Sequence, residues 1–159
     1  MGASLVVTAP TGLYYVDKPV NIGANRWAFK PEVGVSYNSK KRLYLDFYAG
    51  VWLFTANTSF LTDTTTRTQD PLTSLQLHAS YTIATRFWAA IDGTWYSGGA
   101  MQVDGAPSAS RQENSRVGAL LSYGFTSSQS LKLSWSFGAS ARVGQDFTTI
   151  GLAYQYLWF

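Results

Sequence analysis

The sequence contains no cysteine and no run of the ~20 consecutive apolar residues that a membrane-spanning helix requires. The first absence excludes a disulfide framework and suits a protein that crosses an oxidising periplasm. The second excludes a helical membrane protein. Charged residues are also few, at 13% of the chain, and the net charge of +3 is too small and too scattered to indicate a nucleic-acid partner. We expect no cofactor, no bound metal and no nucleic acid.

Aromatic residues, in contrast, make up 16% of the chain, and many of them occupy alternating positions. Residues 131–139 alternate without a break, and residues 150–158 carry an apolar residue at every second position. In the first segment one face carries Leu131, Leu133, Trp135, Phe137 and Ala139, and the other carries Lys132, Ser134, Ser136 and Gly138. This period of two is typical of a β-strand with one apolar and one polar face. Since lipid offers backbone groups no hydrogen-bonding partner, such strands cross a membrane as a closed barrel.

The alternating segments and the turn signals between them predict eight strands. They span residues 3–9, 26–37, 42–55, 72–83, 87–97, 114–125, 130–141 and 147–158. Short turns at 38–41, 84–86 and 126–129 alternate with longer connections at 10–25, 57–71 and 98–113, and a tighter turn lies near 144–146. An even number of strands with short periplasmic turns and longer extracellular loops is the pattern of outer-membrane barrels.

The predicted fold class is therefore all-β, with one domain over residues 1–159: a transmembrane, antiparallel, up-and-down β-barrel of eight strands in a bacterial outer membrane. We expect residues 3–9 to pair with residues 147–158 and close the barrel. The expected partners are the lipid bilayer and the outer-membrane barrel assembly machinery, and the expected state is a monomer. Met1–Ser4 leads directly into the first strand without a signal peptide, so we expect a mature or engineered form.

The face assigned to lipid carries no charged residue on any of the predicted strands. Lys or Arg near the bilayer midplane would cost roughly 2–4 kcal/mol on that face, which explains their absence. Aromatic residues near the strand ends are predicted to lie at the membrane interfaces. These are Trp27, Tyr37, Phe87, Trp95, Tyr123, Phe125, Tyr156 and Trp158. Pro31 lies on this face but has no N–H for the ladder, so we expect a bulge or a locally open pairing there.

The opposite face carries the ionisable residues. The predicted polar network of the barrel interior consists of Lys30, Glu32, Asp46, His78, Asp92, Arg116, Lys132 and Arg142. Pairing Ile83 with Phe87 across the turn at 84–86 places His78 opposite Asp92. An eight-stranded interior is only just wide enough for side chains, so one interpretation is a plugged core in which these charges pair. The other interpretation is a polar pathway for a solute.

The same face also carries residues with the spacing of a hydrolase triad. His78, Ser80 and Asp92 have a spacing similar to that of the triad of the eight-stranded lipid A deacylases, and a Ser activated by an oriented His is sound hydrolase chemistry. All three side chains are predicted to point into the barrel, however, whereas a lipid hydrolase must present its nucleophile to lipid. The flanking residues also differ from that family. We therefore expect a His–Asp hydrogen bond in the interior and no catalytic residues.

The long connections differ in composition. Residues 57–70 are rich in Thr, and residues 98–113 mix Gly, Ser, Pro and Gln, so both are expected to be flexible and solvated. Residues 10–25 instead hold a group of apolar side chains: Leu13, Tyr14, Tyr15, Val16, Val20 and Ile22. These side chains fit either a hydrophobic gate over the barrel mouth or ordinary anchoring at the membrane interface.

One segment carries a family resemblance. Residues 21–34 read N-I-G-A-N-R-W-A-F-K-P-E-V-G, and this segment resembles the N-x-G-x-N-R-W-x-F-K-P-E-x-G motif of outer-membrane proteins grouped under the meta-pathway of phenol degradation. The similarity continues through residues 9–14, 70–71, 75–78, 96–99 and 114–118, and so covers nearly the whole chain.

The resemblance implies passive uptake of small hydrophobic or aromatic molecules at the outer membrane, with no catalytic set to carry over. The alternative, from a different class, is a non-conducting structural barrel that serves as a membrane anchor or folding scaffold. Members of this family are usually longer, with further strands upstream of the position that matches Gly2. The resemblance therefore implies a shortened version that closes with eight strands.

Overall fold

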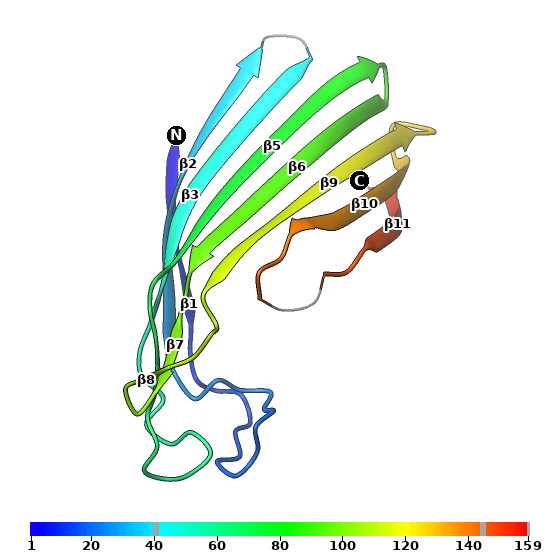
Figure 1. The fold of residues 1–159 in the computed structure, drawn as a ribbon. Helices are drawn as coiled ribbons and strands as arrows, with labels where there is room; N and C mark the ends of the chain where they lie inside the picture. Colours follow the sequence, from blue (N-terminus) through cyan, green and yellow to red (C-terminus); the bar gives the residue numbers. More distant parts are fainter. Residues whose placement is uncertain (40–41, 144–145, 159) are drawn as a thin grey trace.

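Residues 1–39, 42–143 and 146–158 are described by a computed structural model, in which eight antiparallel strands form one curved sheet (Figure 1). In their order across the sheet they are β1 (Gly2–Thr8), β2 (Ala28–Ser39), β3 (Leu43–Phe54), β5 (Leu72–Ala84), β6 (Phe87–Gly98), β9 (Gln112–Gly124), β10 (Gln129–Ser140) and β11 (Thr149–Tyr156). No helix within these described ranges is long and apolar enough to cross a membrane.

The eight predicted strands are confirmed, and every boundary agrees to within two residues. Sheet order follows chain order, which is the up-and-down topology that the short turns predict. The predicted register across the turn at 84–86 is also confirmed at His78 and Asp92, although a shift between Thr82 and Ala84 makes Ala84, and not Ile83, the partner of Phe87. The predicted turns at 38–41 and 144–146 fall partly on residues outside the described ranges.

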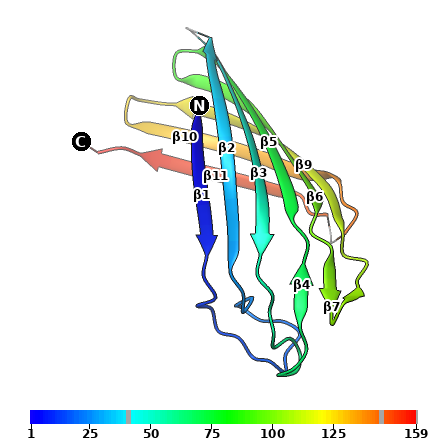
Figure 2. The same ribbon diagram turned by 90° about the vertical axis from the view of Figure 1, so that its left-hand side faces the viewer.

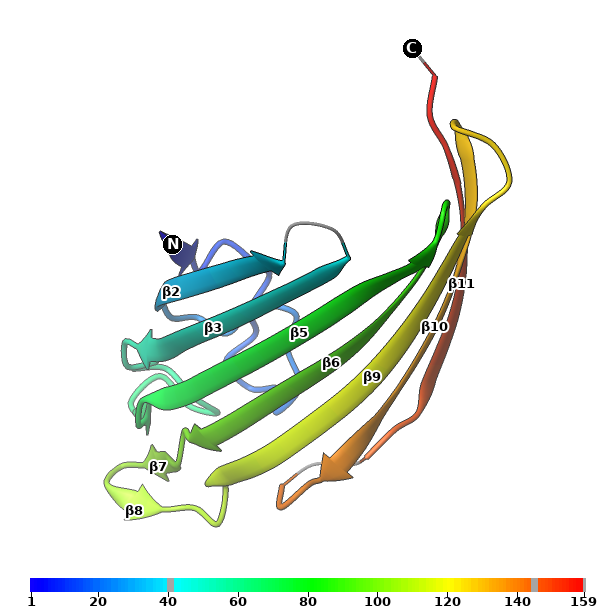
Figure 3. The ribbon, with the colours of Figure 1, turned by 90° about the horizontal axis from the view of Figure 1, so that it is seen from above.

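The predicted closure of the barrel is wrong. Among the described residues β1 pairs only with β2, and β11 pairs only with β10, so residues 3–9 form no ladder with residues 147–158. Figure 3 shows the two edge strands at opposite sides of an open arc. A barrel closes only when tilt and stagger bring its first and last strands together. The bend accumulated over these eight strands is too small for β1 and β11 to meet.

The two faces of the sheet differ in exposure as well as in polarity. Apolar side chains of the face assigned to lipid are widely exposed, for example Leu77, Ile91 and Ile150. On the polar face Ser74 is 0% exposed and Ser122 is 3% exposed. Side chains crowd one another on the inside of a bend and separate on the outside, so the polar face is the inner face of the arc.

The strand pairing is interrupted at Pro31. Between β2 and β3 the ladder runs from Ala28↔Phe54 to Phe29↔Leu53, and it resumes at Glu32↔Gly50 in the same register. Of the two expected outcomes, a bulge and a locally open pairing, the structure has the open pairing. The missing N–H of proline accounts for it, because the ladder lacks a donor there.

The expectation of flexible connections at 57–70 and 98–113 is corrected by a second, small sheet (Figure 2). It contains β4 (Arg67–Gln69), β7 (Met101–Val103) and β8 (Ala106–Pro107). Gly98 and Gly99 turn the chain from β6 into β7 with φ of 106° and 68°, and a Cβ at Gly98 would lie 2.5 Å from the Pro71 carbonyl oxygen. Alternation cannot reveal such short strands, since three residues show less than two full periods.

Candidate functional site

The centre of the polar face holds a row of titratable groups contributed by three neighbouring strands. Asp46 on β3 is the cross-strand partner of His78 on β5, and His78 is the partner of Asp92 on β6. The Nδ1–H of His78 donates to Asp92 Oδ1 at 2.5 Å. Ser80 shares this face, but within the described residues no hydrogen bond joins it to His78. The geometry therefore provides a His–Asp pair without an activated serine nucleophile.

Beside this row the face is hollowed. A hollow of about 260 Å³ is lined by Asp92, Thr94 and Arg116, and its opposite side by Ser134 and Ser136 of β10. The guanidinium of Arg116 donates from Nη2 to Ser136 Oγ at 3.2 Å and to the Phe147 carbonyl oxygen at 3.1 Å. Its central carbon lies 4.1 Å from the Phe147 ring centroid. Arg116 therefore faces the hollow without an acidic partner among the described residues.

Lys132 and Arg142 are the two basic residues predicted for β10 and the loop that follows it. Both lie away from the row formed by Asp46, His78 and Asp92. Lys132 belongs to the turn end of β10, where its Nζ lies 6.0 Å from the Trp88 ring centroid, beside a second hollow of about 280 Å³. Arg142 follows the end of β10, and its Nη1 donates to Glu113 Oε2 at 2.9 Å. Its side chain is 56% exposed. The structure thus divides the eight predicted network residues into separate groups.

Near the other end of β2 and β3, Lys30 and Glu32 form an ion pair in which both side chains are largely buried. The Nζ of Lys30 also lies 5.7 Å from the Trp52 ring centroid. Gly50 makes room for this arrangement, because a Cβ there would lie 2.9 Å from Cε of Lys30. The stem of Lys30 therefore lies across the backbone of β3.

Beyond this end of the sheet, the connections that carry residues 10–26 and 55–70 fold together; we call this the loop cluster (Figure 1). Its hub is the side chain of Asn57, which is 0% exposed. Asn57 Oδ1 accepts from Asn25 Nδ2 and from the Ser59 backbone N–H, each at 3.0 Å, and its Nδ2 donates to the Tyr14 hydroxyl at 2.9 Å. The Tyr14 hydroxyl donates in turn to the Ser59 carbonyl oxygen at 2.9 Å.

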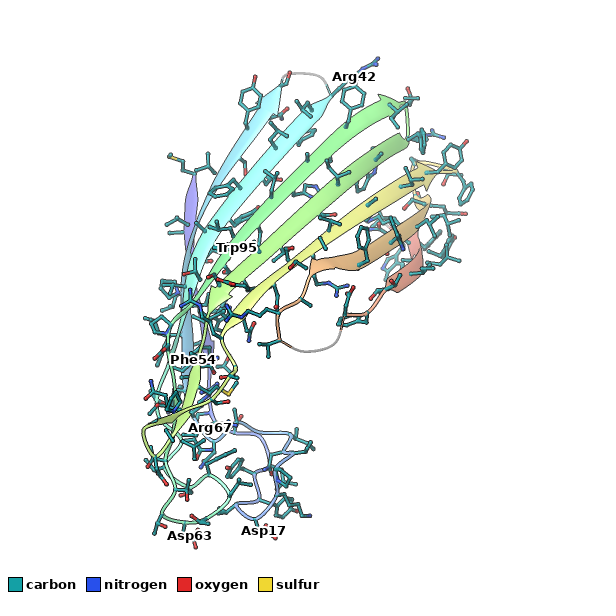
Figure 4. The ribbon with its side chains drawn as sticks, in the orientation of Figure 1. Asp17, Arg42, Phe54, Asp63, Arg67 and Trp95 are labelled. Carbon is teal, nitrogen blue, oxygen red and sulfur yellow. The ribbon has the colours of Figure 1, made fainter. Side chains whose placement is uncertain are left out.

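Two arginines lie inside the loop cluster. The guanidinium carbon of Arg26 lies 4.4 Å from the Phe54 ring centroid, and that of Arg67 lies 4.3 Å from the Phe60 ring centroid. Figure 4 shows Arg67 between Phe54, at the end of the sheet, and the loop tips that carry Asp17 and Asp63. Burial, together with the charge of Arg67, lowers the pKa of Arg26 to about 10. Among the described residues, no carboxylate forms an ion pair with either arginine, so their charges are not paired locally.

The predicted interfacial aromatics occupy both ends of the strands. At the end with the short turns Phe87 pairs with Tyr123, and the Tyr123 and Phe125 rings meet edge to face with centroids 5.4 Å apart. Tyr156 and Trp158 continue the same end, with centroids 6.1 Å apart. Trp27 and Trp95 lie toward the loop cluster, and Tyr37 lies near the end of β2.

Sequence reasoning missed Arg26, Asn57 and Arg67. Arg26 stands inside the segment that carries the family resemblance, which is the one signal that points to it. Asn57 and Arg67 lie in a Thr-rich stretch without periodicity, and nothing local indicates that either is buried.

The comparisons with known proteins concern this whole arrangement. A model of the family described as the MetA-pathway of phenol degradation matches residues 1–156. The chain belongs to this family. The family resemblance of residues 21–34 is thereby confirmed. None of the curated proteins matches the sequence.

Among solved structures, the chain is similar to the crystal structure of an outer membrane channel from Pseudomonas putida F1, with a TM-score of 0.84 and 24% sequence identity. The match covers 98% of this chain and 59% of the channel, so the chain spans about three fifths of that channel's length. This likeness shows the fold, an antiparallel sheet of the kind found in an outer membrane channel. The solved relative is described as a channel and not as an enzyme.

Proposed function

We propose that this chain forms part of the wall of an outer-membrane channel for the passive uptake of small hydrophobic or aromatic molecules. Family membership and the likeness to a solved channel support a transport role. The observation that carries the proposal is the division of the sheet into two faces. One face is apolar, exposed and free of charge, which suits lipid, and the other is concave and polar, which suits a lumen.

The free edges of β1 and β11 bear on how the wall is completed. An unpaired backbone N–H or C=O costs several kcal/mol in lipid, so a working channel requires a strand partner along each edge. The arc also aligns with only 59% of a longer channel chain, which supports a wall of more than eight strands. Wider barrels leave a water-filled lumen that side chains do not fill. The plugged-core interpretation assumed closure with eight strands, and this structure lacks that closure.

Conductance across a planar bilayer tests the proposal. The wild-type protein is expected to give discrete conductance steps, and millimolar phenol is expected to reduce them by occupying the lumen. Ser134→Trp fills the hollow beside Asp92 and is expected to lower the conductance at least two-fold. Leu133→Trp adds a similar bulk one residue away on the face assigned to lipid, where aromatic side chains are common, and is expected to leave the conductance unchanged.

A membrane-inserted protein that never conducts would overturn the proposal and favour a structural barrel. Equal effects of Ser134→Trp and Leu133→Trp would show that the polar face does not line the path. Native mass spectrometry of the conducting species in detergent determines its composition, since one copy and two copies of the chain differ by 17.5 kDa.

A further inference from the structure

A hollow of about 180 Å³ lies within the loop cluster, between the segments that meet at Asn57. Its walls include the side chains of Tyr14, Asn21, Phe60 and Arg67, together with residues 22–24. No acidic side chain of the described residues lines it. Arg67 is therefore the charged group that a molecule in this hollow would meet.

The Arg67 guanidinium has unused hydrogen-bonding capacity. Its Nε is buried and has no hydrogen-bond partner within the described ranges, and no ion pair joins Arg67 to any described carboxylate. Leaving a buried donor unsatisfied costs about 1–3 kcal/mol, and native structures contain few such groups. Stacking on Phe60 holds the plane of the guanidinium but satisfies none of its N–H groups. An arginine placed in this way needs an acceptor that the described residues do not supply.

Arg26 adds a second positive charge behind Arg67. Its Nη2 donates to Oε1 of Gln69, the last residue of β4. The amide Nε2 of Gln69 donates in turn to the Gly99 carbonyl oxygen at 3.0 Å, and these two hydrogen bonds hold the Arg26 guanidinium in place. Its Nη1 is buried without a partner in the described part of the chain. The two guanidinium groups repel each other where water screens them poorly. An anion bound at Arg67 would relieve that repulsion and offer an acceptor to the Arg67 guanidinium.

We propose that the loop-cluster hollow binds the carboxylate group of a one-ring aromatic acid, with Arg67 as its ligand and Arg26 as a supporting charge. The size supports a single ring, since a cavity of about 150 Å³ holds benzene. A guanidinium matches a carboxylate through two parallel hydrogen bonds, and the Phe60 and Tyr14 rings offer apolar surface to the ring of the ligand. This inference rests on the proposed function, because it names the class of solute that such a channel would receive.

A series of side-chain contacts runs from Arg26 to the polar face of the sheet. Arg26 stacks on Phe54, Phe54 stacks on Trp52 with ring centroids 6.4 Å apart, and Trp52 lies beneath Lys30. Two aromatic rings with a positive group at each end thus run from the loop cluster into the concave face. Rings of basic side chains are how pores favour anions, so this order fits a path for an aromatic anion. The path ends at Glu32, which neutralises Lys30.

Equilibrium binding of benzoate to the refolded chain in detergent micelles, measured by isothermal titration calorimetry, tests the inference. Benzyl alcohol is the neutral comparison and is expected to bind at least ten-fold more weakly than benzoate. Arg67→Met is expected to weaken benzoate binding about 10- to 100-fold, because a charged hydrogen-bond donor is lost, and Arg67→Lys is expected to lie between it and the wild type. Arg111→Met is the matched control, since Arg111 is exposed and its nearest acidic contact, with Glu113, is 3.9 Å long.

Limited proteolysis of each variant shows whether the loop cluster has kept its fold. If Arg67→Met does not fold, the wild-type comparison of benzoate with benzyl alcohol and the Arg67→Lys variant still decide the question. Equal affinity for the two compounds, or unchanged benzoate affinity in a folded Arg67 variant, overturns the inference. Binding in micelles does not require conduction, so conduction without benzoate binding would overturn this inference alone, and benzoate binding without conduction would overturn the proposed function alone.

Discussion

The eight-stranded sheet and the loop cluster hold their polar groups in place by different means. In the sheet, backbone ladders fix each side chain, and polarity follows from a strict alternation between two faces. In the loop cluster, side-chain amides and hydroxyls bind one another across 32 to 45 positions of sequence around Asn57. A substitution in the sheet therefore acts mainly through the environment of the face it changes, which is lipid on one side and water on the other. A substitution in the loop cluster acts mainly through the hydrogen-bond partners that it removes.

The comparison is tested most strongly on the face assigned to lipid. Leu133→Arg places a cation on a face where Leu133 and its partner Leu121 are both exposed, and it is expected to cost roughly 2–4 kcal/mol and to abolish insertion into bilayers. Leu121→Arg is expected to do the same. Ser134→Arg, one residue away on the polar face, should insert much more readily. Refolding yields in liposomes, read from heat-modifiable gel mobility, check this expectation, and similar yields for both faces would contradict it.

The next largest effect is expected at the hub of the loop cluster. Asn57→Ala removes the acceptor of Asn25 and of the Ser59 N–H inside a buried site. This should lower the free energy of opening the loop cluster by about 1–3 kcal/mol, so that the cluster opens roughly 5- to 150-fold more often. Limited proteolysis of the folded protein measures that opening. Asn21→Ala is the matched control, because the three side-chain hydrogen bonds of Asn21 are exposed to solvent and reach only Tyr15 and Lys18. Indistinguishable cleavage rates in the two variants would show that Asn57 is not a hub.

The smallest effect is expected at the His–Asp pair. Asp92→Ala removes the hydrogen-bond partner of His78. Because the Asp92 side chain is 48% exposed, we expect the free energy of unfolding to fall by only about 0.5–1.5 kcal/mol. Thr94→Ala, two residues along the same face, should cost less. Urea titrations of both variants provide the measurement. A neutral Asp92→Ala would mean that solvent replaces the carboxylate at no cost.

The sequence predicted the strands well because a two-residue period is a local property. The alternation of residues 131–139 is enough to place β10 and both of its faces, and a single proline predicted an irregularity in the pairing of β2, either a bulge or the open pairing that the β2–β3 ladder has. Closure could not be predicted in this way. It depends on tilt, stagger and the number of strands in the whole wall, which hydropathy does not record.

The loop cluster was beyond the reach of periodicity for a related reason. Asn25 and Asn57 are 32 positions apart, and no local pattern states that their side chains meet. The Thr-rich composition of residues 57–70 pointed instead to a solvated loop. The His78–Asp92 register was accessible because one short turn fixes it.

The gap at Pro31 has a mechanical consequence. It divides the seam between β2 and β3 into a block of two residue pairs next to the loop cluster and a block of eight pairs beyond it, from Glu32↔Gly50 to Ser39↔Leu43. Within this seam, strain from the loop cluster stops after the first two pairs, and it crosses Pro31 through the unbroken β1–β2 ladder from Thr8↔Ala28 to Gly2↔Gly34. The loop cluster is thus tied to the long part of the sheet along the β1 side of β2, whereas on the β3 side only two residue pairs stand between it and the gap.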